Sequence, residues 1–513
     1  MAAAWTAAIA VCGREGVSQV VDFSRDPTAR GFYAPERFES TVYDCTVIGQ
    51  IPSGLNGAFV RVGTEWLYPP RFPDDSIFNA DGFVGLFRFK NGVVDFTGRW
   101  VRTARWHNDK AAQRQLYGYY RNPFTDDPSI RRQTIEKPYL RTLANTNVIA
   151  HAGKLFAMKE DGPPYELDPK TLATRGPMDF AGKYHSQTFS AHPKIDPVSG
   201  EMICYGYEAT GLATSDVYLY TVDRAGAVTR EVRIKVPYVS MIHDIALTQE
   251  HIVIPVFAFE TSLARLKAGK IHWAWNAHLP TYVGILPRHG EARDLRWFKG
   301  PTRAIVHTLN ARTEGDKVIL ESPVSETNPF PFFPAEPGNA DPEGAPRGTN
   351  FRRHVFDLGS RREEFTEEVL VTRSVSGLAR IDDRYISLPN RYAFTGFSDP
   401  SRPFDEARAG NLRGRVTNCY GRFDLHTGAE TSYFAGDTHT LNEPVFVPRS
   451  AGSPEGDGYL IGIANDLAER RSELIIADAN HLEAGDVARV ILPFRLGAQV
   501  HGNWIPQDRL ALT

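Results

Sequence analysis

The sequence has few cysteines, no long hydrophobic run and no excess of charge of either sign. Its 513 residues include four cysteines and no CxxC pair. A secreted scaffold held together by disulfides is therefore not expected, and reduced thiols in a cytoplasmic protein are the simplest interpretation. The net charge of −3 and the pI of about 6.6 give no reason to expect nucleic acid as a partner.

Membrane-spanning segments are also missing from the sequence. No stretch approaches the roughly 20 apolar residues of a spanning helix. The N-terminal stretch MAAAWTAAIAVCGREG is apolar, but it has no basic region at its start, and Arg14 and Glu15 follow too soon for a signal peptide. We expect a cytoplasmic protein, and contact with a membrane surface remains an open alternative.

Helical periodicity is weak, and alternating runs joined by tight turns dominate the chain. In LFRFKNGVVDFTGRW (86–100), Asn91-Gly92 lies between two such runs, which is a strong hairpin signal. The same pattern recurs at 164–176, 217–236 and 421–436, with Asp, Gly and Pro at the turns. The best helix candidate is 259–270, which we interpret as an insertion.

Regular antiparallel hairpins over so long a chain favour radial repetition of small sheets. We predict an all-β fold, a seven-bladed β-propeller with about 70 residues per blade, in which loop and helical insertions cap the top face over a central metal site. Residues 36–513 would form this single domain, after an N-terminal extension over 1–35. The polar stretch 334–350 reads as one long surface loop inside the domain.

Four of the fifteen histidines lie in settings typical of the inner end of a strand. They are His192 in SAHPKID, His243 in MIHDIALT, His307 in IVHTLNA and His501 in VHGNWIP. A ring of sheets would direct all four imidazoles toward one axis, where neutral nitrogen atoms can bind a divalent transition metal. Spacing alone is not a specific signal, because the fold must bring the four together.

Several longer motifs occur in the order found in one known family. They are FNADGFVGLFRF (78–89), YRNPFTDDPS (120–129), KEDGPPYELDP (159–169), SAHPKIDPVSGE (190–201), MIHDIALT (241–248), NPFPFFP (328–334), EPVFVPR (443–449) and VHGNWIP (500–506). The sequence thus resembles the carotenoid cleavage oxygenase superfamily, in particular its lignostilbene dioxygenase branch. This resemblance implies a seven-bladed propeller with Fe(II) on its axis, bound by His192, His243, His307 and His501, and O₂-dependent cleavage of an alkene into two carbonyls.

The resemblance also implies glutamates that accept hydrogen bonds from the ligand imidazoles and fix their orientation. Two of the three family positions are glutamate here, Glu160 and Glu443. The third falls at Gly377, in SGLARIDDRY. We expect one ligand, His307, to be oriented by water or by a backbone carbonyl group instead.

In the lignostilbene branch, a lysine and a tyrosine contact the 4-hydroxyl group of the substrate. They correspond to Lys159 and Tyr120, with Tyr119 as the alternative tyrosine, and an aromatic residue that packs on the phenol ring corresponds to Phe78. A cationic ammonium group beside a phenol lowers the pKa of the phenol. The phenolate would then donate electron density to the conjugated double bond and make it more reactive toward O₂.

The sequence therefore predicts an Fe(II) dioxygenase that cleaves 4-hydroxystilbenoids such as resveratrol or lignostilbene, with 4-hydroxyphenylpropenes such as isoeugenol as further substrates. One alternative is an apocarotenoid oxygenase, for which the aromatic residues of 257–286 would form an apolar surface patch rather than a lid. A second alternative is a propeller that has lost catalysis and binds a ligand. The sequence does not determine the oligomeric state.

Overall fold

A computed structural model describes residues 21–23, 34–412 and 416–510. Most of the expected extension over 1–35 lies outside these residues, so the domain boundary at residue 36 stays a prediction. Two of its described residues pack against the domain: Phe23 against the cluster of Trp66 and Ala80, and Val21 against the cluster of Leu67, Tyr68 and Trp100.

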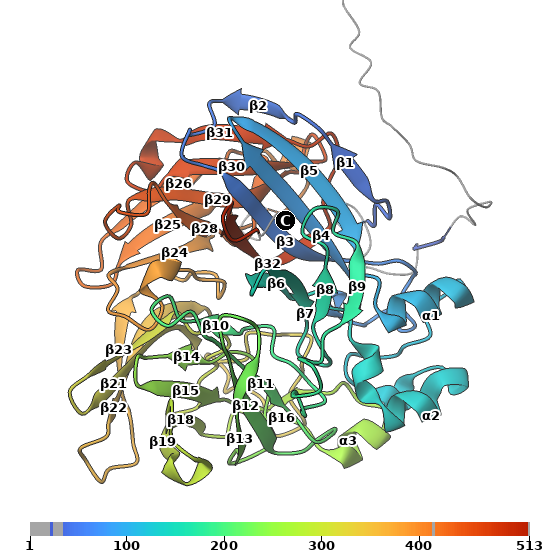
Figure 1. The fold of residues 1–513 in the computed structure, drawn as a ribbon, viewed down its shortest axis with the longest axis vertical. Helices are drawn as coiled ribbons and strands as arrows, with labels where there is room; N and C mark the ends of the chain where they lie inside the picture. Colours follow the sequence, from blue (N-terminus) through green and yellow to red (C-terminus); the bar gives the residue numbers. More distant parts are fainter. Residues whose placement is uncertain (1–20, 24–33, 413–415, 511–513) are drawn as a thin grey trace, which may run out of the picture.

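Seven antiparallel sheets are arranged in a ring, which confirms the predicted seven-bladed β-propeller (Figure 1). The first blade contains β1 (Ser40–Val42), β5 (Val93–Trp100), β4 (Asp81–Lys90), β3 (Gly57–Glu65) and β32 (Ala498–Pro506). The second contains β6 (Asn147–His151), β7 (Lys154–Met158), β8 (Tyr165–Leu167) and β9 (Thr174–Pro177). The third contains β10 (Lys194–Ile195), β11 (Met202–Tyr207), β12 (Asp216–Val222) and β13 (Val228–Lys235).

The remaining blades follow in chain order around the ring. The fourth contains β14 (Ala246–Leu247), β15 (His251–Val256), β18 (Thr281–Pro287) and β19 (Arg296–Gly300). The fifth contains β20 (Asn310–Glu314), β21 (Lys317–Ser325), β22 (Thr349–Asp357) and β23 (Thr366–Val371), and the sixth β24 (Tyr392–Phe397), β25 (Cys419–Asp424) and β26 (Glu430–Phe434). The seventh contains β27 (His439–Leu441), β28 (Val445–Pro448), β29 (Gly458–Asp466), β30 (Arg471–Asp478), β31 (Asp486–Ile491) and β2 (Thr46–Gly49).

The ring is closed twice by strands from distant parts of the chain. β32 pairs with β3, so a C-terminal strand completes the first blade. β2 pairs with β31, so an N-terminal strand completes the seventh. Both closures join the first blade to the seventh, and the position of β32 next to β6 brings residues near 501 to the centre of the ring.

Local sequence accounts for the hairpins. Asn91 and Gly92 both have positive φ, of 53° and 82°, and they connect β4 to β5 as the motif predicted. In β5 buried side chains alternate with more exposed ones, whereas every residue of β3 and β29 is buried. The central strands are buried on both faces because neighbouring blades pack face to face.

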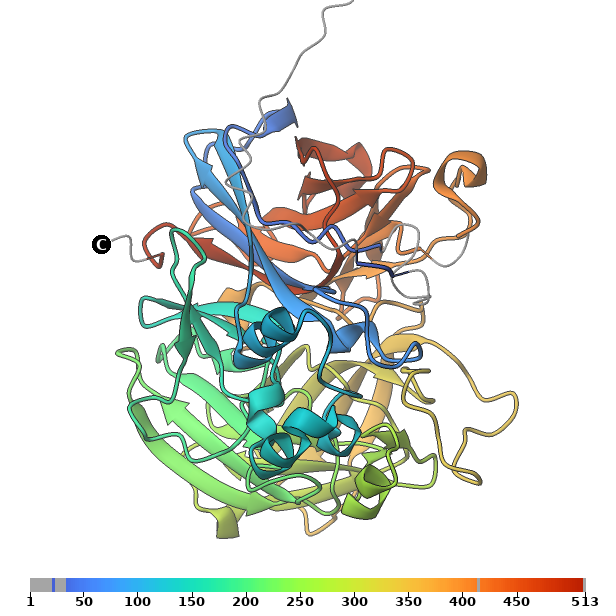
Figure 2. The ribbon, with the colours of Figure 1, turned by 90° about the vertical axis from the view of Figure 1, so that its right-hand side faces the viewer.

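Insertions between strands carry the helices. α1 (Ala104–Ala112) and α2 (Pro128–Glu136) lie between β5 and β6, and α3 (Leu263–Lys267) lies between β15 and β18. These three helices lie together at one side of the ring, whereas α4 (Glu406–Ala409), between β24 and β25, lies elsewhere (Figures 1 and 2). Short 3-10 helices are η3 (Ile77–Asn79), η4 (Pro123–Thr125), η5 (Pro138–Arg141), η6 (Ala292–Asp294), η7 (Asp383–Tyr385) and η8 (Leu482–Ala484).

The helix predicted over 259–270 is wrong in its extent. The segment begins with β16 (Phe259–Glu260), which pairs with β17 (Ala274–Trp275), and only five residues are helical in α3. Ser262, two residues after the strand, caps the helix by accepting a hydrogen bond from the Arg265 amide. Residues 334–348 of the polar stretch are part of a long connection between β21 and β22, as predicted, and its last two residues begin β22.

The hypothesis that the aromatic residues of 257–286 form an apolar surface patch is also wrong. Phe257, Phe259, Trp273 and Trp275 are at most 1% exposed and belong to a hydrophobic cluster with the third and fourth blades. Among the described residues, no helix has the length and apolar character needed to span a membrane. The cysteines Cys45, Cys204 and Cys419 are buried free thiols, and Cys12 lies outside the described residues.

Candidate metal centre and adjoining cavity

The four predicted histidines come from four blades and meet on the axis of the ring. His192, His243 and His307 lie two or three residues before β10, β14 and β20, the first strands of the third, fourth and fifth blades. His501 lies within β32 of the first blade. Three equivalent positions at the start of successive blades therefore converge with His501, as expected for strands at the centre of a propeller.

The ring nitrogens are close enough to share one ion. One nitrogen from each histidine lies within 4.8 Å of the others. The His192 and His243 Nε2 atoms are 3.0 Å apart, and those of His243 and His307 are 3.2 Å apart. Two nitrogens bound at right angles, each about 2.1 Å from a metal, would lie about 3.0 Å apart. The four side chains therefore fit a divalent transition metal.

Burial favours the neutral form of three candidate ligands. It lowers the pKa of His192 and of His307 well below the ordinary range, and the neighbouring imidazoles lower both further. Burial also lowers the pKa of His501, although Glu443 acts in the opposite direction. A neutral imidazole has the free lone pair that a metal requires.

Two buried carboxylates orient two of the imidazoles. Glu160 Oε2 accepts a hydrogen bond of 2.6 Å from His243 Nδ1, and Glu443 Oε1 accepts one of 2.9 Å from His501 Nδ1. Burial alone would raise the pKa of each carboxyl group, but the adjacent histidine and arginine residues hold both at about 2. Because Nδ1 donates in both rings, Nε2 is left as the metal-binding atom.

His307 has a different environment. Its Nδ1 atom is buried and makes no hydrogen bond of standard geometry within the described structure. A Cβ atom placed on Gly377 would lie 3.9 Å from this nitrogen and would have no other atom within 4 Å. The backbone of Gly377 is near enough to raise the pKa of His307 against the effect of burial. The position at which the resemblance implies a glutamate thus faces the predicted ligand.

A cavity of about 330 Å³ adjoins the histidines on the side of the insertions. Aromatic and aliphatic side chains form most of its wall, with a few polar groups. The lining residues are Phe78, Tyr120, Thr146, Lys159, Glu160, Met241, His243, Ala304, Val306, His307, Pro323, Ser325, Pro329, Phe330, Phe332, Phe333, Thr349, Gly377, Leu378, Gln499, Val500 and His501. It has the size and lining of a site for a small aromatic molecule.

Lys159 lies in the wall of this cavity and is 2% exposed. Its Nζ atom donates to the Phe78 carbonyl oxygen and, at 3.0 Å, to Asn145 Oδ1. An ammonium group has three N–H bonds, so one remains for another acceptor. Burial lowers the pKa of Lys159 to about 8, while Asp161 and Glu160 oppose this effect.

Tyr120 connects Lys159 to the histidines. The Lys159 Nζ atom lies 4.7 Å from the centre of the Tyr120 ring, and the Tyr120 hydroxyl donates a 2.7 Å hydrogen bond to Glu160 Oε1. Burial, followed by the charge of Glu160, raises the pKa of Tyr120 well above its ordinary value. The hydroxyl proton therefore points to Glu160, and the oxygen lone pairs remain available to accept a hydrogen bond.

Tyr119, the alternative tyrosine, does not line the cavity. Its hydroxyl donates to Asp74 at 2.8 Å, and its ring stacks on Phe72. Phe78 does line the cavity, where its ring lies 5.5 Å from that of Phe332. The motif at 328–334 supplies Phe332 together with Phe330 and Phe333, so the aromatic wall comes from two distant segments.

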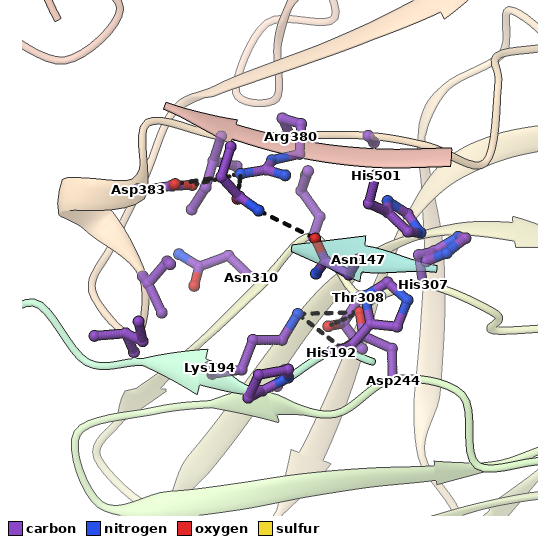
Figure 3. Close-up of a pocket in the computed structure, with 18 of the residues that line it drawn as sticks. Asn147, His192, Lys194, Asp244, His307, Thr308, Asn310, Arg380, Asp383 and His501 are labelled. Atoms are coloured by element: carbon purple, nitrogen blue, oxygen red, sulfur yellow. Dashed lines mark hydrogen bonds and ion pairs between the residues drawn. The ribbon is translucent and has the colours of Figure 1, made fainter. Parts of the chain in front are cut away.

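A second cavity, of about 140 Å³, lies against the histidines along the axis of the ring (Figure 3). It contains more charged groups than the first, including Lys194, Asp244, Arg380 and Asp383. Arg380 donates to the Gly502 carbonyl oxygen at 3.0 Å, next to His501. These polar residues were not among the sequence-based candidates.

Sequence reasoning also missed the residues that hold Tyr120 and Lys159 in place. Arg121 donates to the Glu160 carbonyl oxygen and to the Glu208 carboxylate, and Glu208 also contacts His272 at 3.1 Å. All three side chains are at most 2% exposed. Arg121 adjoins Tyr120 in the sequence, but nothing in the motifs indicates that positions 121, 208 and 272 meet.

Comparison with known proteins agrees with this arrangement. The family model described as retinal pigment epithelial membrane protein matches residues 33–506. Lignostilbene-alpha,beta-dioxygenase isozyme III of Sphingomonas paucimobilis is 41% identical over 486 residues, covering 94% of this chain and 97% of that protein. Isoeugenol monooxygenase of Pseudomonas putida is 41% identical over 480 residues, covering 93% and 98%.

A solved structure shares the whole fold. The crystal structure of Pseudomonas brassicacearum lignostilbene dioxygenase superposes with a TM-score of 0.89 at 37% sequence identity. The match covers 95% of this chain and all of that one. The chain therefore belongs to the carotenoid cleavage oxygenase family, which the retinal pigment epithelial membrane protein model describes.

Proposed function

We propose that this protein is an Fe(II)-dependent dioxygenase that cleaves the double bond between the two rings of 4-hydroxystilbenoids. One alkene and one O₂ molecule give two aromatic aldehydes, so each former alkene carbon gains one oxygen atom. Lignostilbene and resveratrol are substrates of this class. The proposal agrees with the dioxygenase names of the relatives and with the cavity beside the four histidines.

His192, His243, His307 and His501 would hold the iron, with Glu160 and Glu443 fixing two of the rings. Bound Fe(II) would supply the activation of O₂ that a protein side chain alone cannot provide. Four neutral ligands leave the full positive charge on the ion, unlike the sites that contain two histidines and one carboxylate. The carboxylates of Glu160 and Glu443 balance this charge from behind the rings.

The unused N–H bond of Lys159 is the observation that carries the choice of substrate. A phenolate oxygen is the acceptor that a buried ammonium group favours most, because the charges are opposite and water is excluded. Tyr120 would accept the hydrogen bond of the neutral phenol when it enters. Proton loss from the 4-hydroxyl group, stabilised by Lys159, would then enrich the conjugated double bond in electrons.

The rest of the cavity suits a flat aromatic molecule. Phe78 and Phe332 face the cavity near Lys159 and would contact the phenol ring. Isoeugenol also has a phenol hydroxyl group conjugated to an alkene, so the same subsite would accept 4-hydroxyphenylpropenes. A hydrocarbon polyene offers no acceptor to Lys159, and the aromatic residues expected to form a membrane patch are buried, which disfavours the apocarotenoid alternative.

The first experiment is reconstitution with Fe(II) under anaerobic conditions, followed by addition of air-saturated resveratrol and analysis of the products. We expect two hydroxybenzaldehydes, and we expect their formation to require both iron and a free 4-hydroxyl group. The 4-O-methyl ether of the same stilbene is the matched control.

Each other result would change the proposal in a defined way. Cleavage of the methyl ether at the same rate would contradict the role of Lys159 and Tyr120. Iron binding without cleavage of any phenolic alkene would favour the apocarotenoid alternative. A folded protein that binds no iron would favour the propeller that only binds a ligand.

A further inference from the structure

Asp244 lies directly after the candidate ligand His243 and on the axial side of the histidines. Its side chain is 2% exposed and lines the second cavity, away from the proposed substrate site. Figure 3 shows it beside Lys194 and Thr308, below the imidazoles.

The carboxylate of Asp244 joins three separate chain segments. Oδ2 accepts hydrogen bonds from the Thr308 amide at 2.8 Å and from the Thr308 hydroxyl at 2.9 Å. Oδ1 pairs with Lys194 Nζ at 2.8 Å and also accepts from the Ile245 amide at 2.8 Å. These donors occupy most of the acceptor sites of the carboxylate, and none of them belongs to the substrate cavity.

Each of these residues adjoins a candidate metal ligand. Lys194 comes two residues after His192, and Thr308 comes directly after His307. The three histidine segments belong to the third, fourth and fifth blades, which are separate sheets without a shared ladder of backbone hydrogen bonds. The backbone bridge between Lys299 and Glu364 joins the fourth and fifth blades at their outer strands, away from the histidines. Near the axis, side chains connect the three segments.

We propose that Asp244 is a positioning residue that fixes His192, His243 and His307 relative to one another before the metal binds. Converging lone pairs of neutral imidazoles repel one another, and these rings approach to 3.0 and 3.2 Å between Nε2 atoms. One carboxylate bound to all three segments opposes that repulsion and limits the reorganisation that metal binding requires. The inference rests on the proposed metal centre but does not depend on the identity of the substrate.

The test is titration of the full-length protein with Co(II) in competition with a chelator. Asp244→Ala should weaken Co(II) binding by about 10- to 100-fold, the range typical of residues that support metal ligands. The KM for the phenolic alkene should stay unchanged in protein fully loaded with Fe(II), because Asp244 does not line the substrate cavity. Asp244→Asn keeps an oxygen for Thr308 and should restore part of the affinity.

Asp424→Ala is the matched control. Asp424 is also a buried carboxylate, but it binds Arg391 in the sixth blade, away from the histidines. Loss of a supporting ion pair should lower the stability of this variant while leaving Co(II) affinity within twofold of the wild type. A general effect of removing a buried aspartate would instead weaken metal binding in both variants, and that result would overturn the proposal.

Two milder variants are available if Asp244→Ala does not fold. Lys194→Met and Thr308→Val each remove one contact of the same carboxylate, so their effects on Co(II) affinity should not be additive in the double variant. Wild-type affinity in both single variants, or in folded Asp244→Ala, would overturn the role of Asp244. Wild-type protein that binds no Co(II) would overturn the metal centre itself, which distinguishes the two failures.

Discussion

Lys159 illustrates how the fold changes the chemistry of a common residue. An exposed lysine stays cationic to a pH near 10, whereas burial lowers the pKa of this one to about 8. Below pH 8 the ammonium group is charged and can stabilise a phenolate; above it, the group becomes neutral and loses that capacity. We therefore expect kcat/KM for a 4-hydroxystilbene to fall as the pH rises through about 8.

Replacing Lys159 by methionine removes the charge and retains an unbranched side chain of similar length. We expect Lys159→Met to lower kcat/KM for resveratrol by about 100-fold, within the usual contribution of a group that moves or stabilises a proton. The decrease of activity above pH 8 should disappear in this variant. Metal content, measured by elemental analysis, should remain one per chain, and wild-type kinetics would remove Lys159 from the substrate site.

Glu160 accepts hydrogen bonds from both Tyr120 and His243, so a glutamine cannot replace it. An amide has one oxygen for two donors, and its NH₂ group would face one of them. Glu160→Gln should weaken Co(II) binding by about 10- to 100-fold. Glu166→Gln in the neighbouring strand β8, where the carboxylate pairs with Lys154, is the control and should bind Co(II) normally. Equal affinity in both variants would show that Glu160 does not support His243.

The Cβ position of Gly377 faces His307, where the family resemblance implies a carboxylate. The φ of Gly377 lies outside the left-handed region, and apart from its chain neighbours the heavy atom within 4 Å of its Cβ position is His307 Nδ1, at 3.9 Å. Gly377→Glu should therefore fold, with a change in the free energy of unfolding within about 1 kcal/mol, because a new hydrogen bond to a charged group offsets its burial. Chemical denaturation measures this change, and Co(II) affinity should rise. A large loss of stability would show that the space is filled.

At the scale of elements, buried polar groups connect the insertions to the propeller. Arg121 precedes η4, Glu208 follows β11, and His272 lies between α3 and β17, so one buried cluster ties three elements together. The cluster fixes the segment that carries Tyr120. An unpaired charge in this buried cluster would destabilise the folded protein far more than an unpaired charge at the surface.

Glu208→Gln should lower the free energy of unfolding by about 3–5 kcal/mol, because it leaves the Arg121 guanidinium group buried without its counter-ion. Glu136→Gln removes the partner of Arg132 in an exposed pair on α2 and should cost less than about 1 kcal/mol. Urea denaturation of both variants provides the comparison. Similar values for the two would show that the buried cluster does not hold the insertion.

Some elements could be predicted from sequence and others could not, for physical reasons. The Asn91-Gly92 turn was predictable because its backbone conformation depends on those two residues. α1 and α2 were missed because each is only nine residues long, although Asp127-Pro128 is a start signal that local reading could have found. The strand at Phe259–Glu260 was taken for helix because its partner strand, β17, lies fourteen residues later.

At the residue scale, the proposed ligands could be named from sequence because each lies in a distinctive motif. Asp244 lies in one of the same motifs, yet its role escaped notice, since its partners Lys194 and Thr308 are 50 and 64 residues away. The choice between Tyr119 and Tyr120 also required the fold, because adjacent residues of a loop point in different directions. Contacts between distant segments are the information that local patterns lack.

At the scale of the whole molecule, a metal bound by the four histidines would connect the first, third, fourth and fifth blades. A ligand that binds only the folded state stabilises that state by about 2.7 kcal/mol when the concentration of free ligand is a hundred times Kd. We therefore expect Co(II) to raise the midpoint of thermal unfolding, measured by circular dichroism. His501→Ala should abolish the increase, and an equal increase in that variant would show that the ion binds elsewhere.

The position of His501 in β32 determines when this site can exist during synthesis of the protein. A ribosome makes the segments of His192, His243 and His307 first, and the sixth and seventh blades follow. Only when β32 has been made can it pair with β3, and the same event both closes the ring and delivers the fourth nitrogen. A partly made chain therefore lacks the fourth nitrogen of the proposed metal site, so the complete site would form only after β32 has closed the ring.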